Sequence, residues 1–372
     1  MFSSVSHAYS HACILSIPPL LLLLTSEFST SITAISLSIT LSGLLFGAGA
    51  LPFGKLSDRI GPITVNMIGV AISIVACAGL YFSKDIWVFS CMLILMGIGS
   101  STYHPSAFKL ISCMYAPTMG RAFGINGLIG NIGQIGAPVT AGLIAYTWGW
   151  RNVFIFLLLL GVVTLALLGS IRSDARDIYS FEEKEKAPFS IGRSLLLILL
   201  LTSLAGLAYR GITTMLPTYA TLAYNEDTFV ASAYVTILLA TGGLSQLIAG
   251  ELNDRFGSYR PLVVMGVACI ASVVLMMTES YVLFLIGLVA FGFSYFAVNL
   301  YTNSIVGSIT PASQRGSYYG ITFFTRFGLG FVAAMIVGKI TDTYSIDYLF
   351  PILIAFLVPF VIAAMLLKRE SQ

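Results

Sequence analysis

The sequence predicts an all-α integral membrane protein in which twelve transmembrane helices form two pseudo-symmetric six-helix bundles. Of its 372 residues, 57% are hydrophobic and only 9% are charged, and a water-soluble domain of that composition would aggregate. Apolar runs of about 20 residues, the length that crosses a hydrocarbon core of about 30 Å, occur about twelve times. Two similar motifs, Gly54–Gly61 (GKLSDRIG) and Gly250–Gly257 (GELNDRFG), each follow two apolar runs. This near repeat indicates a chain built as two related halves.

The predicted spans divide evenly between the halves. Residues 1–170 are expected to form an N-terminal bundle and residues 194–372 a C-terminal bundle, joined by a cytoplasmic linker, 171–193. The linker carries charges of both signs, and we interpret it as a solvated tether. The spans are placed near residues 4–25, 31–53, 64–82, 87–112, 121–146, 151–170, 194–222, 229–250, 261–278, 281–308, 316–341 and 346–367.

The distribution of Lys and Arg predicts the orientation. With the N-terminus in the cytoplasm, fourteen of these cations fall on the inner side and only Lys84, Arg151 and Lys339 on the outer side, which is typical of positive-inside topology. We therefore expect both termini to be cytoplasmic. We also expect a monomer in the plasma (inner) membrane. The opening apolar run lacks a basic leader and a small-residue cleavage site, so we expect a span rather than a cleaved signal. The net charge of +3 follows from this topology and predicts no nucleic-acid partner.

Polar residues are concentrated in particular spans. The third, sixth, ninth and twelfth spans are almost wholly aliphatic, whereas the others carry polar stripes, and this period of three suggests that each half contains two three-helix units. The pattern resembles the major facilitator superfamily across the whole chain. Gly54–Gly61 is similar to that superfamily's loop motif, and the glycines from Gly127 to Gly142, with Pro138, are similar to its antiporter motif. The resemblance implies the major facilitator fold and a secondary transporter, either antiporter or symporter.

Within the superfamily, the chain resembles the fosmidomycin-resistance group of exporters. Gly97–Lys109 (GIGSSTYHPSAFK) is similar to that group's pattern of glycines and serines followed by His-Pro and a cation. His7 and His11 resemble its His-x-x-x-Asp motif, with His11 where an acid usually stands.

Two arginines carry the prediction of a substrate class. Arg210 and Arg326 lie deep inside apolar spans, where a cation costs at least about 2.5 kcal/mol on insertion scales. None of the sixteen acids is placed in the middle of a span. We infer that the missing counter-charge is a small anionic substrate, because a guanidinium binds a carboxylate or phosphate through two hydrogen bonds. The alternative is that backbone carbonyls and water satisfy both arginines.

The three histidines are candidates for proton coupling. His7 and His11 share a helix face, and with His104 they are the groups at cavity depth that titrate near neutral pH. Matching Pro18 with Pro217 in the first spans of the two halves places His11 at a position equivalent to Arg210. We expect His11 and His104 to bind substrate and carry a proton. The alternative, a hydrogen bond to a neighbouring helix, is preferred for His7.

Metal and cofactor binding are not predicted. The spacing of His7 and His11 suits a metal ion, but no acid or thiolate is placed beside them. The chain has no P-loop motif, so we expect gradients to drive transport.

Further polar residues complete the predicted site. Tyr295, Asn299 and Asn303 repeat every four residues on one helix face, and such a stripe normally faces the bundle interior. We assign substrate binding also to Tyr209, Asn299, Asn303 and Gln134. For gating we assign the charges of the two repeated motifs, which are expected to latch helix ends: Asp58, Arg59, Asp254 and Arg255.

The predicted function is a secondary active transporter that moves a small organic anion by alternating access, with possible proton coupling. An efflux pump for drugs or amphipathic compounds, with the same fold, is the alternative. A non-transporting membrane sensor is a third reading. We expect no enzymatic activity, because no nucleophile–base pair or metal cluster stands out in the sequence.

Overall fold

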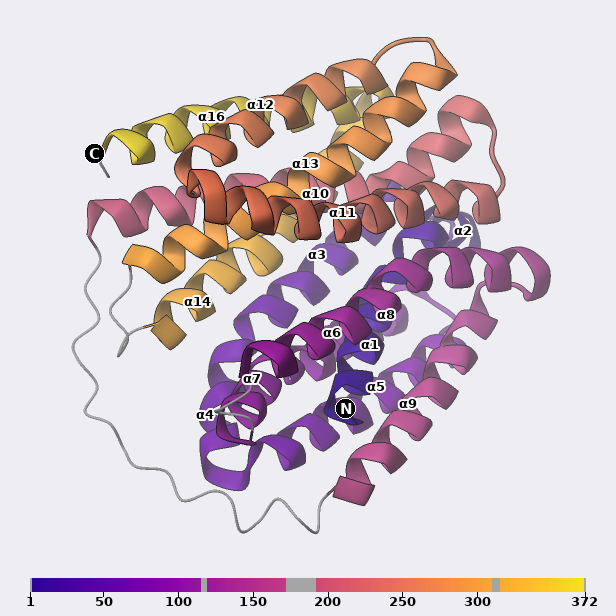
Figure 1. Cartoon of the computed structure of the whole chain (residues 1–372). Coiled ribbons are helices and arrows are strands. Elements are labelled where there is room, and N and C mark those ends of the chain that lie inside the picture. The colour runs from indigo at the N-terminus through magenta and orange to yellow at the C-terminus, as the bar shows by residue number, and fades with distance from the viewer. Residues whose placement is uncertain (1, 115–118, 172–191, 310–314, 371–372) are drawn as a thin grey trace. The chain divides into compact units, whose positions relative to one another are not determined.

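The chain is all-helical, as predicted. The computed structural model describes residues 2–114, 119–171, 192–309 and 315–370, and Figure 1 shows helices along this part of the chain, which contains no strand. Eleven helices of the described residues are long and apolar enough to cross a membrane, or up to twelve if one bent pair counts as a single span. The prediction of twelve transmembrane helices matches the upper number.

The chain divides into two compact units. The N-terminal unit comprises Met1–Glu183 with Asn225–Ala233, and the C-terminal unit comprises Lys184–Tyr224 with Tyr234–Gln372. Most of the predicted linker, residues 172–191, lies outside the described residues.

The N-terminal unit contains the first six predicted spans. The first of them is interrupted after Leu15, because Pro18 and Pro19 cannot donate backbone hydrogen bonds to a continuing helix. The helices of this unit are α1 (Phe2–Leu15), α2 (Leu21–Glu27), α3 (Ile32–Ala48), α4 (Ala50–Ile60), α5 (Pro62–Phe82), α6 (Ile86–Ser101), α7 (Tyr103–Met114), α8 (Met119–Trp148) and α9 (Arg151–Ile171).

Two prolines break spans of this unit at equivalent distances. Helices α3 and α4 meet at a bend of 42°, and Pro52 stands four residues after Ala48, the last residue of α3. Likewise, Pro105 stands four residues after Ser101, the last residue of α6. A proline ring clashes with the carbonyl four residues earlier and removes the hydrogen bond to it. The second break positions the beginning of α7, where Tyr103 and His104 lie.

The C-terminal unit contains the remaining spans. Its second span, α11, is one continuous helix where the equivalent α3–α4 span is bent. The repeated motifs nevertheless end alike, since Gly61 and Gly257 follow α4 and α11 with positive φ angles of 90° and 70°, which glycine adopts without strain. The helices are α10 (Arg193–Tyr224), α11 (Thr228–Phe256), α12 (Tyr259–Met276), α13 (Tyr281–Ile309), α14 (Arg315–Phe323), α15 (Val332–Thr343) and α16 (Leu349–Glu370).

The eleventh predicted span is broken around Arg326. Between α14 and α15 the backbone forms a π-helical turn, Phe324–Gly328, and then a 3₁₀ turn, Leu329–Phe331. No proline stands here, so the break has a different origin from those at Pro52 and Pro105. π-turns inside helices are frequently associated with functional sites. The break holds Arg326 in the interior of the C-terminal unit.

Candidate functional site

Arg326 lies in the π-helical turn and is held by two asparagines of α13. It is 3% exposed. Its Nη1 donates to Oδ1 of Asn299 and, at 3.0 Å, to Oδ1 of Asn303. The predicted stripe of amides on α13 therefore does contact the buried cation, because residues four apart lie on one helix face.

One edge of the Arg326 guanidinium has no hydrogen-bond partner among the described residues. Its Nε and Nη2 atoms are buried and have no hydrogen-bond partner among the residues that the structure describes. These two N–H groups point in parallel along the same side of the planar group, which is the arrangement that binds both oxygens of a carboxylate. The asparagines thus occupy Nη1 and leave a two-donor edge.

Arg210 lies on α10 and is surrounded by aromatic rings. It is also 3% exposed, and its Cζ lies 4.1 Å from the ring centre of Phe331 and 5.6 Å from that of Phe327. The ring of the adjacent Tyr209 is 5.2 Å away. Such cation–π contacts stabilise a buried cation without neutralising its charge. Both phenylalanines belong to the broken segment that carries Arg326, so the break positions the surroundings of both arginines.

Tyr209 of α10 contacts α13 beside the two arginines. Its ring stacks on that of Tyr295 with centres 4.6 Å apart and planes 4° from parallel, and Tyr295 precedes Asn299 by one helical turn on α13. Tyr209, Asn299 and Asn303, which were predicted as site residues, therefore lie around Arg210 and Arg326. The role of these residues in substrate binding stays a prediction.

A close helix contact fixes this arrangement. A Cβ atom at Gly206 would lie 2.3 Å from the carbonyl oxygen of Arg326, so only glycine lets α10 approach the π-helical turn so closely. Next to it, the hydroxyl oxygens of Thr202 and Thr325 are 2.6 Å apart.

No acid neutralises the two arginines within the described residues. The ion pairs found there are Arg151–Glu27, at 2.8 Å, and Arg255–Glu251. Arg210 and Arg326 are therefore two uncompensated buried charges in this part of the chain.

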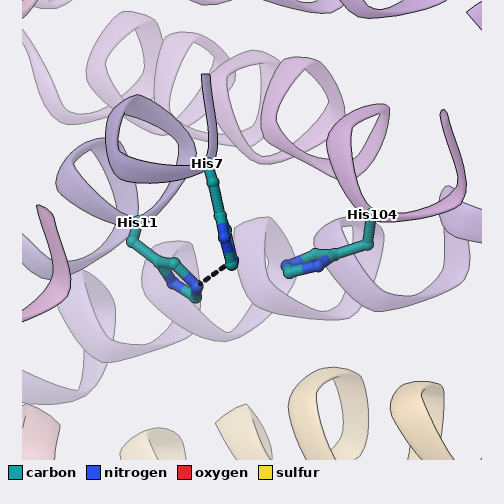
Figure 2. A group of neighbouring side chains, drawn as sticks. All are labelled: His7, His11 and His104. Atoms are coloured by element: carbon teal, nitrogen blue, oxygen red, sulfur yellow. Dashed lines mark hydrogen bonds between the residues drawn. The ribbon is translucent and has the colours of Figure 1, made fainter. Parts of the chain in front are cut away.

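The histidines form a separate cluster in the N-terminal unit (Figure 2), and we call His7, His11 and His104 the histidine cluster. Nε2 of His11 lies 3.1 Å from Nε2 of His7, one helical turn away on α1. His104, from α7, places its ring centre 5.2 Å from that of His7 and 5.7 Å from that of His11. His104 is buried, whereas His7 and His11 are half-buried.

Neighbouring helices orient His7. Its Nδ1 lies 2.9 Å from the backbone carbonyl oxygen of Asn126 on α8, and because a carbonyl can only accept, Nδ1 carries the proton. Tyr103 stacks on the His7 ring, with centres 4.6 Å apart, and donates to Oδ1 of Asn126 at 2.5 Å. The hydrogen bond to α8 agrees with the expectation that His7 bonds to a neighbouring helix. The close approach of His7 to His104 was not predicted. No sequence signal places residues 7 and 104 side by side.

Glycines of α8 make room for α1. A Cβ atom at Gly130 would lie 2.2 Å from Nδ1 of His7, and one at Gly133 would lie 2.3 Å from the carbonyl oxygen of Ala8. Gln134 follows on the same helix and is half-buried. Two glycines of the predicted glycine face, Gly130 and Gly133, therefore pack closely against α1. Substrate binding by Gln134, His11 and His104, and proton coupling by the two histidines, stay predictions.

The predicted gating residues are exposed. Asp58, Arg59 and Asp254 lie at the ends of α4 and α11 with exposed side chains, and Arg59 forms no ion pair with an acid of the described residues. Arg255 donates to Glu251 one turn earlier on its own helix. This pair differs from the predicted latch to another helix end, because the four-residue spacing puts both side chains on one face. The gating roles stay predictions.

Comparison with known proteins agrees with the fold and the motifs. The sequence pattern of the Major Facilitator Superfamily matches residues 1–335. The chain belongs to the major facilitator superfamily. It is therefore a multi-pass membrane protein of a family of transporters, as the repeated motifs predict. The finer resemblance to the fosmidomycin-resistance group stays a prediction.

Two of the similar proteins align with most of the chain. The chain is 24% identical over 358 residues to a protein of Escherichia coli (strain K12) named "Probable L-galactonate transporter", covering 87% of this chain and 78% of that protein. It is 24% identical over 320 residues to the "Multi-drug resistance efflux pump PmrA homolog" of Lactococcus lactis subsp. lactis (strain IL1403), covering 83% and 78%.

Solved structures show the same fold. A bacterial homolog of the human lysosomal transporter Spinster, in an inward-facing and occupied conformation, matches 99% of this chain and 96% of its own with a TM-score of 0.82 at 15% identity. Identity that low supports the fold alone.

Proposed function

We propose that this transporter moves a small organic anion, with a carboxylate as the group that it recognises. The observation that carries the proposal is the buried two-donor edge of Arg326, which has no hydrogen-bond partner among the described residues. Nε and Nη2 are without a partner among the described residues, and each buried N–H left unbonded costs about 1–3 kcal/mol. A bound carboxylate would satisfy both donors at once.

The charges support the same substrate class. An arginine in a membrane span costs about 2.5 to 3.5 kcal/mol on insertion scales, so it is rarely retained without a function. Arg210 and Arg326 are two such cations, and no carboxylate of the described residues pairs with either. An anion would provide the compensation that this part of the chain lacks.

A relative points to the same chemistry. The Escherichia coli protein is named for L-galactonate, which is a sugar-acid anion. We infer that transport occurs by alternating access, in which the site opens to one side of the membrane at a time. We also propose that the protein is a monomer in the plasma membrane and that both of its termini are cytoplasmic.

Counterflow in proteoliposomes tests the proposal. Vesicles loaded with unlabelled small carboxylates, L-galactonate among them, should accumulate the labelled compound. Arg326→Gln should abolish this exchange, whereas Arg326→Lys should retain part of it, since lysine keeps the charge without the two-donor edge. Arg151→Gln is the matched control, because it removes a cation whose ion pair with Glu27 is partly exposed. Full exchange by Arg326→Gln would refute the proposal.

Drug efflux is the second candidate. The Lactococcus lactis relative is named a multidrug efflux pump, the resemblance of Gly97–Lys109 to the fosmidomycin-resistance group favours export, and the stacked rings of Tyr209 and Tyr295 offer an apolar surface. Resistance to apolar drugs in cells that express the protein, without carboxylate exchange, would favour this function.

A further inference from the structure

The histidine cluster has the composition of a metal site. The chain contains three histidines, and all three meet here, with one ring nitrogen from each lying within 4.8 Å of the others. They come from two helices about ninety residues apart in the chain. Chance placement of three histidines among 372 residues would rarely bring all of them together, so the arrangement calls for a chemical explanation.

The sequence predicts no metal site at His7 and His11. That prediction depended on the lack of an acid or thiolate beside His7 and His11. The structure instead supplies a third imidazole, because the helix break before Pro105 turns His104 toward α1. Three histidines with one open position are an established ligand set for Zn²⁺.

The hydrogen bonds prepare His7 as a ligand. Its Nδ1 proton is directed to the carbonyl of Asn126 at 2.9 Å, which leaves the lone pair on Nε2 directed at the cluster. Metal-binding histidines usually donate their other N–H to such a carbonyl, which fixes the ring orientation. Nε2 of His11 lies 3.1 Å from Nε2 of His7, and the dashed line in Figure 2 marks this hydrogen bond. Because Nε2 of His7 accepts, Nε2 of His11 is the donor in this hydrogen bond. An ion bound between the two rings would take the place of that proton, which moves to Nδ1 of His11 as the neutral ring changes tautomer.

The distances suit a small ion. Nitrogens bound to one tetrahedral Zn²⁺ at about 2.0–2.1 Å lie about 3.4 Å from each other. The His7–His11 separation needs to widen only slightly, and the 4.8 Å limit of the cluster requires a side-chain movement of little more than about 1 Å to close. The half-burial of His7 and His11 leaves a route for the ion to enter.

We propose that His7, His11 and His104 bind a divalent transition-metal ion of the Zn²⁺ class, with a fourth position open to water or a small anion. Imidazole ligands favour Zn²⁺, Cu²⁺, Ni²⁺ and Co²⁺ over Mg²⁺ and Ca²⁺, which prefer oxygen. The bound ion connects α1 to α7 within the N-terminal unit. This site shares no residue with the carboxylate-binding edge of Arg326, which belongs to the C-terminal unit.

Zn²⁺ titration of the purified full-length protein, without a polyhistidine tag, tests the site. The wild type should bind one equivalent by calorimetry, and His104→Gln should weaken the affinity by more than about 10-fold, the smallest effect usual for losing even an outer-shell partner. Ser106→Ala is the matched control on the same helix, because its buried hydroxyl has no hydrogen-bond partner among the described residues. Equal Zn²⁺ affinity in His104→Gln and the wild type would overturn the proposal.

Two measurements on the wild type keep the test decisive if the variant does not fold. Bound Cu²⁺ should give imidazole nitrogen couplings in its electron paramagnetic resonance spectrum, which can arise only from this cluster because the chain has no other histidine. Zn²⁺ should also protect the three histidines from diethylpyrocarbonate, as mapped by mass spectrometry. Absence of both effects would overturn the proposal, and normal carboxylate exchange in the same preparation would show that the anion site survives.

Discussion

The polar centres of the two units carry opposite chemistry on related scaffolds. The N-terminal unit gathers three imidazoles, whose nitrogen lone pairs bind cations, whereas the C-terminal unit holds two buried guanidiniums, which bind anions. Both centres lie beside a break, after Ser101 in α6 and around Arg326 between α14 and α15. The two breaks fall in spans that do not correspond between the halves, the fourth and the eleventh, so the related halves differ both in where a helix is interrupted and in which side chains the break presents.

The largest expected effect comes from giving the C-terminal centre its own anion. Asn299→Asp places a carboxylate where Oδ1 of Asn299 already accepts from Nη1 of Arg326. The internal pair should neutralise the site and weaken carboxylate binding by at least about 10-fold, since hydrogen bonds to charged groups contribute about 1.5–3 kcal/mol. A thermal-shift titration of the purified protein with the transported carboxylate measures the loss.

Asn299→Ser is the matched control, because it removes the amide without adding a charge. It should weaken binding less than Asn299→Asp. Carboxylate binding by Asn299→Asp that is equal to or stronger than that of the wild type would contradict an anion site at Arg326. The Zn²⁺ affinity of Asn299→Asp should match that of the wild type.

An intermediate effect is expected from displacing one histidine. Gly130→Val puts a branched side chain where even a Cβ would lie 2.2 Å from Nδ1 of His7. Overpacking of this kind costs about 1–3 kcal/mol, and the displaced ring should lower Zn²⁺ affinity by about 10-fold. Calorimetry on the same variant should show carboxylate binding equal to that of the wild type. That result would separate the effect on the histidine cluster from any effect on the arginines of the C-terminal unit.

The control for this variant lies on the same helix. Gly136→Val adds a side chain at a position where, apart from the surrounding turns of α8 itself, nothing lies within 4 Å of the added Cβ, so it should retain wild-type Zn²⁺ affinity. If Gly136→Val lowered Zn²⁺ affinity as much as Gly130→Val, a general effect on α8 would replace the local explanation.

The smallest effect concerns the contact behind Arg326. Thr202→Val removes one hydroxyl of the pair with Thr325, whose oxygens are 2.6 Å apart, and should reduce stability by about 1 kcal/mol. Thermal unfolding in detergent should show a lower midpoint. Thr213→Val, which removes a hydroxyl bonded only within α10, should lower it less, and the reverse order would argue against the contact.

Much of the fold could be predicted because it depends on composition and local spacing. Apolar run length indicated the spans, and the four-residue repeat of Asn299 and Asn303 correctly put both amides on one face, where they meet Arg326. The pair of Glu251 and Arg255 was equally local, yet it was missed in favour of a latch to another helix.

The rest depended on tertiary contacts that local patterns do not encode. The meeting of His104 with His7 requires both the break before Pro105 and the close packing of α8 at Gly130. The π-helical turn at Arg326 contains no proline from which it could be predicted. Its position follows from packing against Gly206 of α10, a neighbour more than a hundred residues away in the chain.

That turn also changes how the side chains are rotated about the helix axis. A π-helical turn is wound more loosely than an α-helix, whereas the 3₁₀ turn that follows it, Leu329–Phe331, is wound more tightly. The two deviations from α-helical winding have opposite signs and partly cancel before α15 begins. A helical wheel with one constant angle per residue, drawn through Tyr318–Thr343, therefore misplaces the side chains of this segment, Arg326 among them. Deleting a single residue from Phe324–Gly328 would remove the loose turn and is expected to turn the guanidinium of Arg326 away from Asn299 and Asn303.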